Sequence, residues 1–228
     1  MYVVKDYDER RNEFLDTAMR LFLERGYEQT SVNAIIESVG VSKGAFYHYF
    51  RTKEEVLDQL ADRATVQAAA LLEPVVTDES LNAVAKLNEL FHRTNAFKAQ
   101  NLELMRTLLR VYFSDQNVLL RRRLLAQNVE VVGPLIARIL EQGNREGTMA
   151  VDFPEEAAAF VLRIGAELVE QIARLFSEID RDPSAVDRIL RHLEMYNQSV
   201  ERILGVEPGG LSLVDESVVT VIKGVSDD

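Results

Sequence analysis

Basic, hydroxyl-bearing and aromatic side chains gather in one short stretch of the sequence that contains no acidic residue. The stretch runs from Ser38 to Lys53 and includes Lys43 and Arg51 as its other basic residues. Ammonium, guanidinium and hydroxyl groups are the donors that proteins use to bind phosphate oxygens. The whole chain carries a net charge of −11, which taken alone argues against a polyanionic partner. The stretch therefore predicts a local phosphate-binding surface on an acidic protein.

Catalytic and metal chemistry find little support in the sequence. The absence of cysteine excludes disulfides, thiolate metal sites and a cysteine nucleophile. Glu89 and His92 have the Glu-x-x-His spacing of di-metal helical bundles, but the unit occurs once, since Ile189 stands three residues before His192. Neither a Gly-rich phosphate loop nor another catalytic motif is present. We therefore expect no enzyme activity, no catalytic residues, no cofactor and no metal site.

Two short helices joined by a tight turn are expected to position the basic stretch. Thr30 is expected to cap the first of them, which ends at Gly40, and Ser42 to cap the second, which runs to about Tyr49. A glycine suits the turn because the backbone there needs a positive φ. This pattern is typical of a helix–turn–helix unit. With Phe46 directed inward, the other face of the second helix presents Lys43, Gly44, Ala45, Tyr47 and His48.

Helical periodicity continues over most of the remaining chain. A first helix is predicted over residues 8–25, and a fourth opens at Thr52 and stops before Pro74. Gly133-Pro134 predicts a kink or break. Longer amphipathic segments cover 79–97, 100–113, 115–146, 154–178 and 183–204. We therefore expect an all-α fold of about nine helices, in which a three-helix N-terminal helix–turn–helix domain precedes a larger C-terminal helical bundle.

A resemblance to a known family adds to this pattern over about residues 10–60. The N-terminal segment resembles the DNA-binding domain of the tetracycline-repressor (TetR/AcrR) family. In that family a three-helix module binds operator DNA, and a larger helical domain binds a small molecule and dimerises through its last two long helices. The matching residues are Phe14, Ala18, Leu21, Phe22, Gly26, Tyr27, Thr30, Ser31, Val32, Ile35, Gly40, Val41, Ser42, Gly44, Phe46, Tyr47, Tyr49, Phe50, Lys53 and Leu57.

The resemblance implies roles for individual residues. Thr30 and Ser31 would contact phosphates at the start of the second helix, and Lys53 would reach the DNA backbone from the start of the fourth. The recognition helix would contribute Ser42, Lys43, Gly44, Ala45, Tyr47 and His48. The arm before the first helix departs from the usual pattern, because Asp6, Asp8 and Glu9 precede Arg10-Arg11.

Three regions follow from the helix pattern and the resemblance together. Residues 1–52 are expected to form the DNA-binding domain, 53–205 a helical ligand-binding and dimerisation domain, and 206–228 a C-terminal tail. Within the tail, Val218–Ile222 is compatible with a short strand, although a loosely ordered segment is favoured. Apolar residues that could line a ligand cavity are Phe91, Met105, Leu109, Tyr112 and Phe160.

These features together favour a cytoplasmic, homodimeric regulator of transcription that binds double-stranded operator DNA. Apolar stripes on the last two helices, which include Ile189 and Val200, could form the dimer interface. We expect a repressor released by a small-molecule effector, with no membrane association. An activator of the same fold and a different kind of helix–turn–helix protein remain alternatives. From another class, a helical ligand-binding or scaffold protein without DNA binding would agree with the charge of −11 but would not explain the basic stretch.

Overall fold

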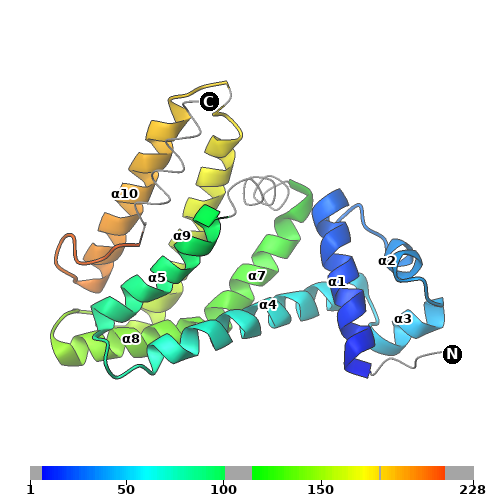
Figure 1. Cartoon of the computed structure of the whole chain (residues 1–228), viewed down its shortest axis with the longest axis horizontal. Helices are drawn as coiled ribbons and strands as arrows, with labels where there is room; N and C mark the ends of the chain where they lie inside the picture. Colours follow the sequence, from blue (N-terminus) through cyan, green and yellow to red (C-terminus); the bar gives the residue numbers. More distant parts are fainter. Residues whose placement is uncertain (1–6, 101–114, 180, 214–228) are drawn as a thin grey trace. The chain divides into compact units, whose positions relative to one another are not determined.

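The computed structural model describes residues 7–100, 115–179 and 181–213 (Figure 1). Over these ranges the chain forms nine α-helices and no strand, which confirms the all-α prediction. The predicted segment 100–113 lies almost wholly outside them. The elements are α1 (Tyr7–Arg25), α2 (Val32–Val39), α3 (Lys43–Tyr49), α4 (Lys53–Val76), α5 (Ala83–Gln100), the 3-10 turn η1 (Asp115–Asn117), α7 (Val118–Val131), α8 (Gly133–Glu146), α9 (Pro154–Phe176) and α10 (Ala185–Leu204).

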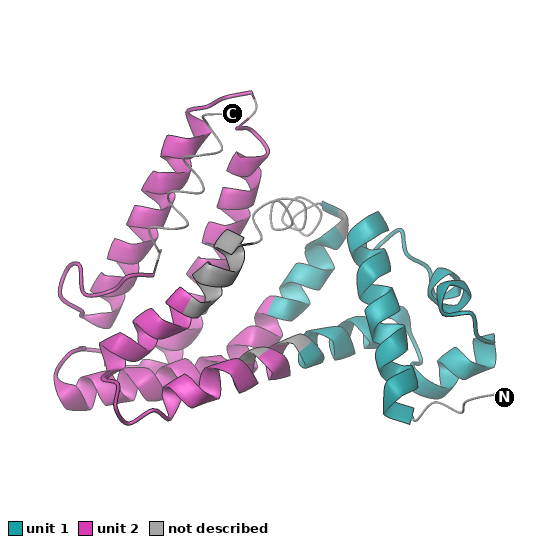
Figure 2. Ribbon diagram, viewed as in Figure 1, with its two compact units in different colours: residues 1–64, 111–124 teal, residues 65–110, 125–228 magenta. Residues whose placement is uncertain are grey.

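The chain divides into two compact units (Figure 2). Unit 1 comprises residues 1–64 and 111–124, and unit 2 comprises residues 65–110 and 125–228. This division differs from the predicted boundary after residue 52, because Val56, Leu57 and Leu60 of α4 are buried in the core of unit 1. The functional division at residue 52 stays a prediction.

Aromatic side chains make up much of the core of unit 1. The ring of Phe14 in α1 lies edge-on to Phe46, with centroids 5.5 Å apart, and to Phe50 at 5.9 Å. All three side chains are fully buried. Such edge-to-face pairs are favourable beyond their buried area. They hold α3 against α1 by its inner face, as the sequence predicted for Phe46.

A buried asparagine from a distant part of the chain completes unit 1. Asn117 of η1 accepts a hydrogen bond from the backbone amide of Tyr27 (2.8 Å) and donates one to the carbonyl of Phe22 (3.4 Å). Its side chain is fully buried, as is Leu120 one turn later. Because a buried backbone amide without a partner is costly, Asn117 stabilises the connection between α1 and α2.

The core of unit 2 is built from α5, α8, α9 and α10, with the end of α4. A buried lysine, Lys86, joins three of these helices: its ammonium group donates to the carbonyl of Val76 (2.6 Å) and to Oε1 of Gln142 (2.8 Å). The carboxylate of Glu146 accepts a hydrogen bond from the backbone amide of Ala83 at the start of α5 (2.9 Å). This hydrogen bond is the main reason why the pKa of Glu146 lies below its ordinary value.

Two prolines have different effects on the helices of unit 2. The prediction that the fourth helix stops before Pro74 is wrong, since α4 continues to Val76. A proline there removes one hydrogen bond in the last turn, and the burial of Val75 and Val76 offsets that loss. The predicted break at Gly133-Pro134 is confirmed, because α7 ends at Val131 and α8 begins at Gly133.

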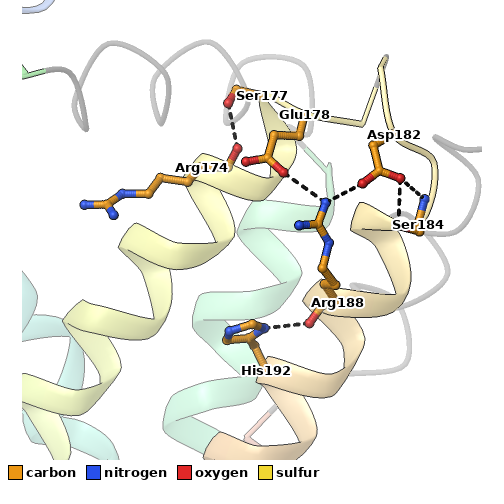
Figure 3. A network of polar contacts seen from close by, with 7 residues as sticks. All are labelled: Arg174, Ser177, Glu178, Asp182, Ser184, Arg188 and His192. Atoms are coloured by element: carbon orange, nitrogen blue, oxygen red, sulfur yellow. Dashed lines mark hydrogen bonds and ion pairs between the residues drawn. The ribbon is translucent and has the colours of Figure 1, made fainter.

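A polar network fixes the turn between α9 and α10 (Figure 3). The guanidinium group of Arg188 donates to carboxylate oxygens of Glu178 (2.9 Å) and Asp182 (2.7 Å). The other oxygen of Asp182 accepts from the hydroxyl (2.7 Å) and the backbone amide (3.0 Å) of Ser184. One turn further along α10, Nδ1 of His192 donates to the carbonyl of Arg188 (2.7 Å). The hydrogen bond from the Ser184 hydroxyl, with the Arg188 charge, lowers the pKa of Asp182 below its ordinary value of 3.8.

The lowered pKa predicts how replacing Asp182 changes stability with pH. Because the folded state favours the charged carboxylate, its contribution is fully present above pH 3.8 and is lost as the pH falls through the lower folded-state pKa. We expect Asp182→Asn to have a lower melting temperature than the wild type near pH 7, and the gap to close on acidification. Thermal unfolding followed by circular dichroism from pH 7 to pH 2 measures this gap. The exposed Asp187→Asn variant is the control, and a gap that persists unchanged at pH 2 would contradict the assignment.

Candidate nucleic-acid interface

Serine side chains cap both helices of the helix–turn–helix unit. Oγ of Ser31 accepts a hydrogen bond from the amide of Ala34 (3.1 Å), and Oγ of Ser42 accepts one from Ala45 (3.3 Å). Between the helices Gly40 has φ = 76°, the left-handed conformation that glycine adopts without strain. The predicted turn and the cap at Ser42 are therefore confirmed. The predicted cap at Thr30 is wrong, because Ser31 occupies the capping position.

The side chain of Thr30 instead forms hydrogen bonds inside unit 1. Its hydroxyl donates to the carbonyl of Gly26 (2.8 Å) and lies 3.2 Å from the carbonyl of Leu21, and its side chain is fully buried. A side chain without solvent exposure cannot touch a phosphate, so the predicted phosphate contact of Thr30 is corrected. Ser31, by contrast, is exposed.

The outer face of α3 brings together the remaining predicted residues. Ser42, Lys43, Gly44, Tyr47 and His48 are exposed, and Ala45 is half-buried. The ammonium group of Lys43 lies 5.9 Å from the centroid of the Tyr47 ring. A Cβ added at Gly44 would meet nothing closer than Oγ of Ser42 at 4.0 Å, so this point of the helix is open. The face offers hydroxyl and ammonium donors around a place where another backbone can approach closely.

Tyr7 extends this surface from the start of α1. Its ring lies edge-on to the imidazole of His48, with centroids 5.8 Å apart, and 4.7 Å from the ring of Tyr49. Sequence reasoning missed Tyr7, because helical spacing carries no information about which helix ends meet. Its contacts restrict the orientation of His48 on the outer face of α3.

Lys53 faces inward rather than along the surface. Its ammonium group donates to the carbonyl of Tyr27 (2.9 Å) and lies 4.2 Å from the centroid of the Tyr27 ring. Burial of that ring raises the pKa of Tyr27 to about 12. The phosphate contact expected of Lys53 stays a prediction, and its ammonium group has an internal partner. Arg51 is exposed in the same acid-free stretch and was omitted from the predicted site.

The comparison with known families matches this part of the chain. Residues 14–60 fit the model of the bacterial regulatory proteins of the tetR family. Over these residues the chain is therefore similar to the tetR-family regulators. The chain is 34% identical to the transcriptional repressor KstR2 of Mycobacterium tuberculosis over 89 residues, 39% of this chain and 44% of that protein. It is 39% identical over 77 residues to the repressor AcnR of Corynebacterium diphtheriae, 34% of this chain and 38% of that protein. The chain thus spans less than half the length of either relative.

Solved structures show the TetR fold over most of the chain. A protein of Syntrophomonas wolfei described as a TetR-family transcriptional regulator superposes with a TM-score of 0.63 at 23% identity, covering 89% of this chain and all of that one. FadR of Bacillus subtilis, solved with stearoyl-CoA, superposes with a TM-score of 0.56 at 19% identity. The match covers 81% of this chain and 96% of the FadR chain. None of the helices in the described part of this chain combines the length and hydrophobicity needed to span a bilayer.

The structure places the residues predicted to line a ligand cavity in different environments. Phe91 is half-buried against the core of unit 2. Phe160 is 53% exposed in the single chain, and its assignment to a ligand cavity stays a prediction. Other residues of α9, among them Val161 and Leu168, pack in or against the core of unit 2. Met105, Leu109 and Tyr112 lie outside the described residues.

The internal bond of Lys53 predicts a stability effect that Lys43 does not share. We expect Lys53→Ala to lower the free energy of unfolding by about 1–3 kcal/mol, because it removes a charge-assisted hydrogen bond and a cation–π contact. Lys43→Ala, at an exposed position, should change it by less than about 0.5 kcal/mol. Urea denaturation followed by circular dichroism measures both. Equal stabilities of the two variants would show that the Lys53 bond does not persist in solution.

Proposed function

We propose that this protein is a transcriptional repressor that binds operator DNA as a homodimer and leaves it when a small molecule binds. The exposed outer face of α3 carries the proposal, because it unites phosphate donors, an open glycine and no acidic group. KstR2 and AcnR are named as transcriptional repressors, which supports the same function here and agrees with the expectation that the chain is not an enzyme. We place this activity in the cytoplasm.

Two groups of residues would contact the DNA. Ser31, Ser42, Lys43 and Tyr47 are exposed donors that would bind phosphates and position the protein on the duplex. Arg51 would add a further phosphate contact. On the helix itself, Gly44 allows close approach, the Ala45 methyl group suits contact with a thymine methyl group, and His48 can bond to a base edge or phosphate.

The effector is proposed to bind the helical part that follows the DNA-binding unit. FadR, which shares the fold, has been solved with an acyl-CoA, and this supports a small-molecule site in unit 2. The helix α4 has its first residues in unit 1 and its last in unit 2, so it is a continuous connection through which ligand binding would act. Coupling of this kind is reciprocal: bound DNA must weaken effector binding by the same factor.

Dimer formation is proposed from exposed apolar side chains on the last two helices. Phe160 of α9 and Met195 of α10 are 53% and 61% exposed. Ile189 and Val200, which the sequence assigned to the interface, are instead buried within the protomer. One seven-residue recognition helix reads few base pairs, whereas two related by a twofold axis would read half-sites roughly 34–36 Å apart or a multiple of that distance.

Salt dependence distinguishes this proposal from a ligand-binding or scaffold protein without DNA binding. A duplex selected from a random pool is labelled, and its affinity is measured by fluorescence anisotropy at several salt concentrations. Affinity should fall steeply with salt, and Lys43→Ala should lower the slope by about one, because the variant neutralises one phosphate fewer. Arg181→Ala, at an exposed site in unit 2, is the matched control. If no duplex is selected, or if affinity does not depend on salt, the proposal fails.

Gly44→Leu tests the orientation of the recognition helix. The leucine side chain would stand where DNA must approach, so operator binding should be abolished. Stability should be unchanged or increase by about 1 kcal/mol, since leucine is the better helix former and the site has room for it. Gly44→Ala, with only a methyl group added, should lose less affinity. Normal operator binding by Gly44→Leu would place another face of α3 against the DNA.

Phe160→Glu tests the dimer. A charge introduced at an apolar interface should shift the protein to monomers, because the carboxylate would lose its hydration without a partner. Sedimentation velocity at micromolar concentration measures the mass. Leu71→Glu, at a position of unit 2 that is 72% exposed, is the control and should leave a dimer intact. A wild-type protein that sediments only as a monomer would refute the interface.

A further inference from the structure

The segment that follows α10 is held by side chains of two helices. Oδ1 of Asn88 in α5 accepts a hydrogen bond from the amide of Ser212 (2.7 Å), and its Nδ2 donates to the carbonyl of Gly210 (3.1 Å). Oδ1 of Asn197 in α10 accepts from the amide of Leu213 (3.1 Å), and its Nδ2 donates to the carbonyl of Leu211 (3.2 Å). The expected loose order of the tail is therefore wrong for residues 206–213. Val218–Ile222 lies outside the described residues.

The pattern of these bonds is that of an extended peptide. Asn88 binds the carbonyl of one residue and the amide two residues later, and Asn197 repeats this pattern one residue further along. In an extended chain such successive pairs point to opposite edges, so the two asparagines take the place of two neighbouring strands. Oε1 of the buried Glu201, one turn after Asn197, also accepts from the amides of Gly209 (2.9 Å) and Leu211 (3.1 Å).

Side chains of the segment alternate in the same way. Leu211 and Leu213 are 4% and 3% exposed and belong to the core of unit 2, whereas Ser212 between them is exposed. Gly210 is required by space, because a Cβ there would lie 2.8 Å from Cγ1 of Val206 and 3.0 Å from the carbonyl oxygen of Glu207. The core of unit 2 thus selects leucine at two alternate positions, and the segment's own turn at Val206 and Glu207 requires glycine before them.

We propose that α5 and α10 form a peptide-binding site, whose ligand is an extended Gly-Leu-x-Leu peptide and whose resident ligand is the chain's own segment 206–213. The side chains of Asn88, Asn197 and Glu201 supply the partners for the backbone of residues 211–213. Recognition of a backbone by such groups, with pockets for alternate side chains, is the mode by which sheet edges bind peptides.

Two glycines with positive φ lie where the chain leaves α10 and turns into the extended part of the segment. The segment leaves α10 through Gly205 (φ 65°) and passes a second left-handed glycine, Gly209 (φ 81°). Asn144 also bonds to backbone through its side-chain amide, but it pairs with both groups of the single residue Val151, seven positions away, whereas Asn88 is 122 residues from Gly210. A covalently linked ligand occupies its site at a high effective concentration, so the site stays filled until the segment is released. The proposal does not depend on DNA binding.

Binding of the peptide in trans tests the site. Leu211→Ala with Leu213→Ala in the full chain weakens the resident ligand and leaves the side chains of α5 and α10 intact. A fluorescent peptide with the sequence of residues 206–213 should bind this variant at least tenfold more tightly than the wild type. A peptide with both leucines replaced by alanine should not bind, nor should the wild-type peptide bind when Asn88→Ala and Asn197→Ala are added. No binding to the folded variant, or equal binding to variant and wild type, would overturn the proposal.

If the leucine variant does not fold, hydrogen exchange of the wild type tests whether residues 206–213 can separate from α5 and α10. The amides of Ser212 and Leu213 should exchange through an opening that leaves the amides of Val200 and Leu204 in α10 protected. Asn88→Ala should speed exchange at Ser212, whereas the control Asn144→Ala should not. Exchange of the segment only together with α10 would show that residues 206–213 are an inseparable part of the core.

Discussion

Phe14 of α1 packs edge-on against Phe46 and Phe50, and this contact holds a helix that could not persist alone. A helix of seven residues closes too few hydrogen bonds to offset the entropy of its nucleation. The orientation of α3 therefore depends on its buried side. Because two phenylalanines four residues apart fix the inner face, Lys43, Gly44 and Tyr47 face outward together. The proposed DNA-binding surface thus depends on an aromatic core that is buried inside unit 1.

Polar side chains that are buried or half-buried fix positions in unit 1 more precisely than apolar packing does. Asn117, Thr30 and Lys53 each bond to a backbone group in or beside the turn between α1 and α2, and each would leave a buried partner unsatisfied if it moved. Three separate parts of the sequence thereby stabilise the conformation of the turn between α1 and α2. Hydrophobic contacts tolerate small displacements, whereas a hydrogen bond is lost within a fraction of an ångström. The starts of α2 and α4 are consequently fixed relative to the end of α1.

In unit 2, amide and charged side chains bond to backbone groups that have no helical partner. Lys86 and Glu146 bond to backbone groups at the end of α4 and the start of α5. Asn88 and Asn197 hold an extended segment in a helical protein in which the described residues form no strand. An amide side chain offers one donor and one acceptor side by side, as the peptide group does. The backbone groups of an isolated extended segment can thus be hydrogen-bonded without a neighbouring strand.

Local sequence determined the helices, the Gly40 turn, the cap at Ser42 and the outward set on α3, because periodicity and capping act over three to five residues. It also carried the family resemblance. Tertiary structure decided that Ser31 rather than Thr30 caps α2, that Lys53 bonds inward, and that α4 extends past Pro74. It alone joined Asn117 to Tyr27 and Asn88 to Ser212, residues 90 and 124 positions apart. Such contacts leave no local signal, since their energy comes from burying polar groups that only the folded chain brings together.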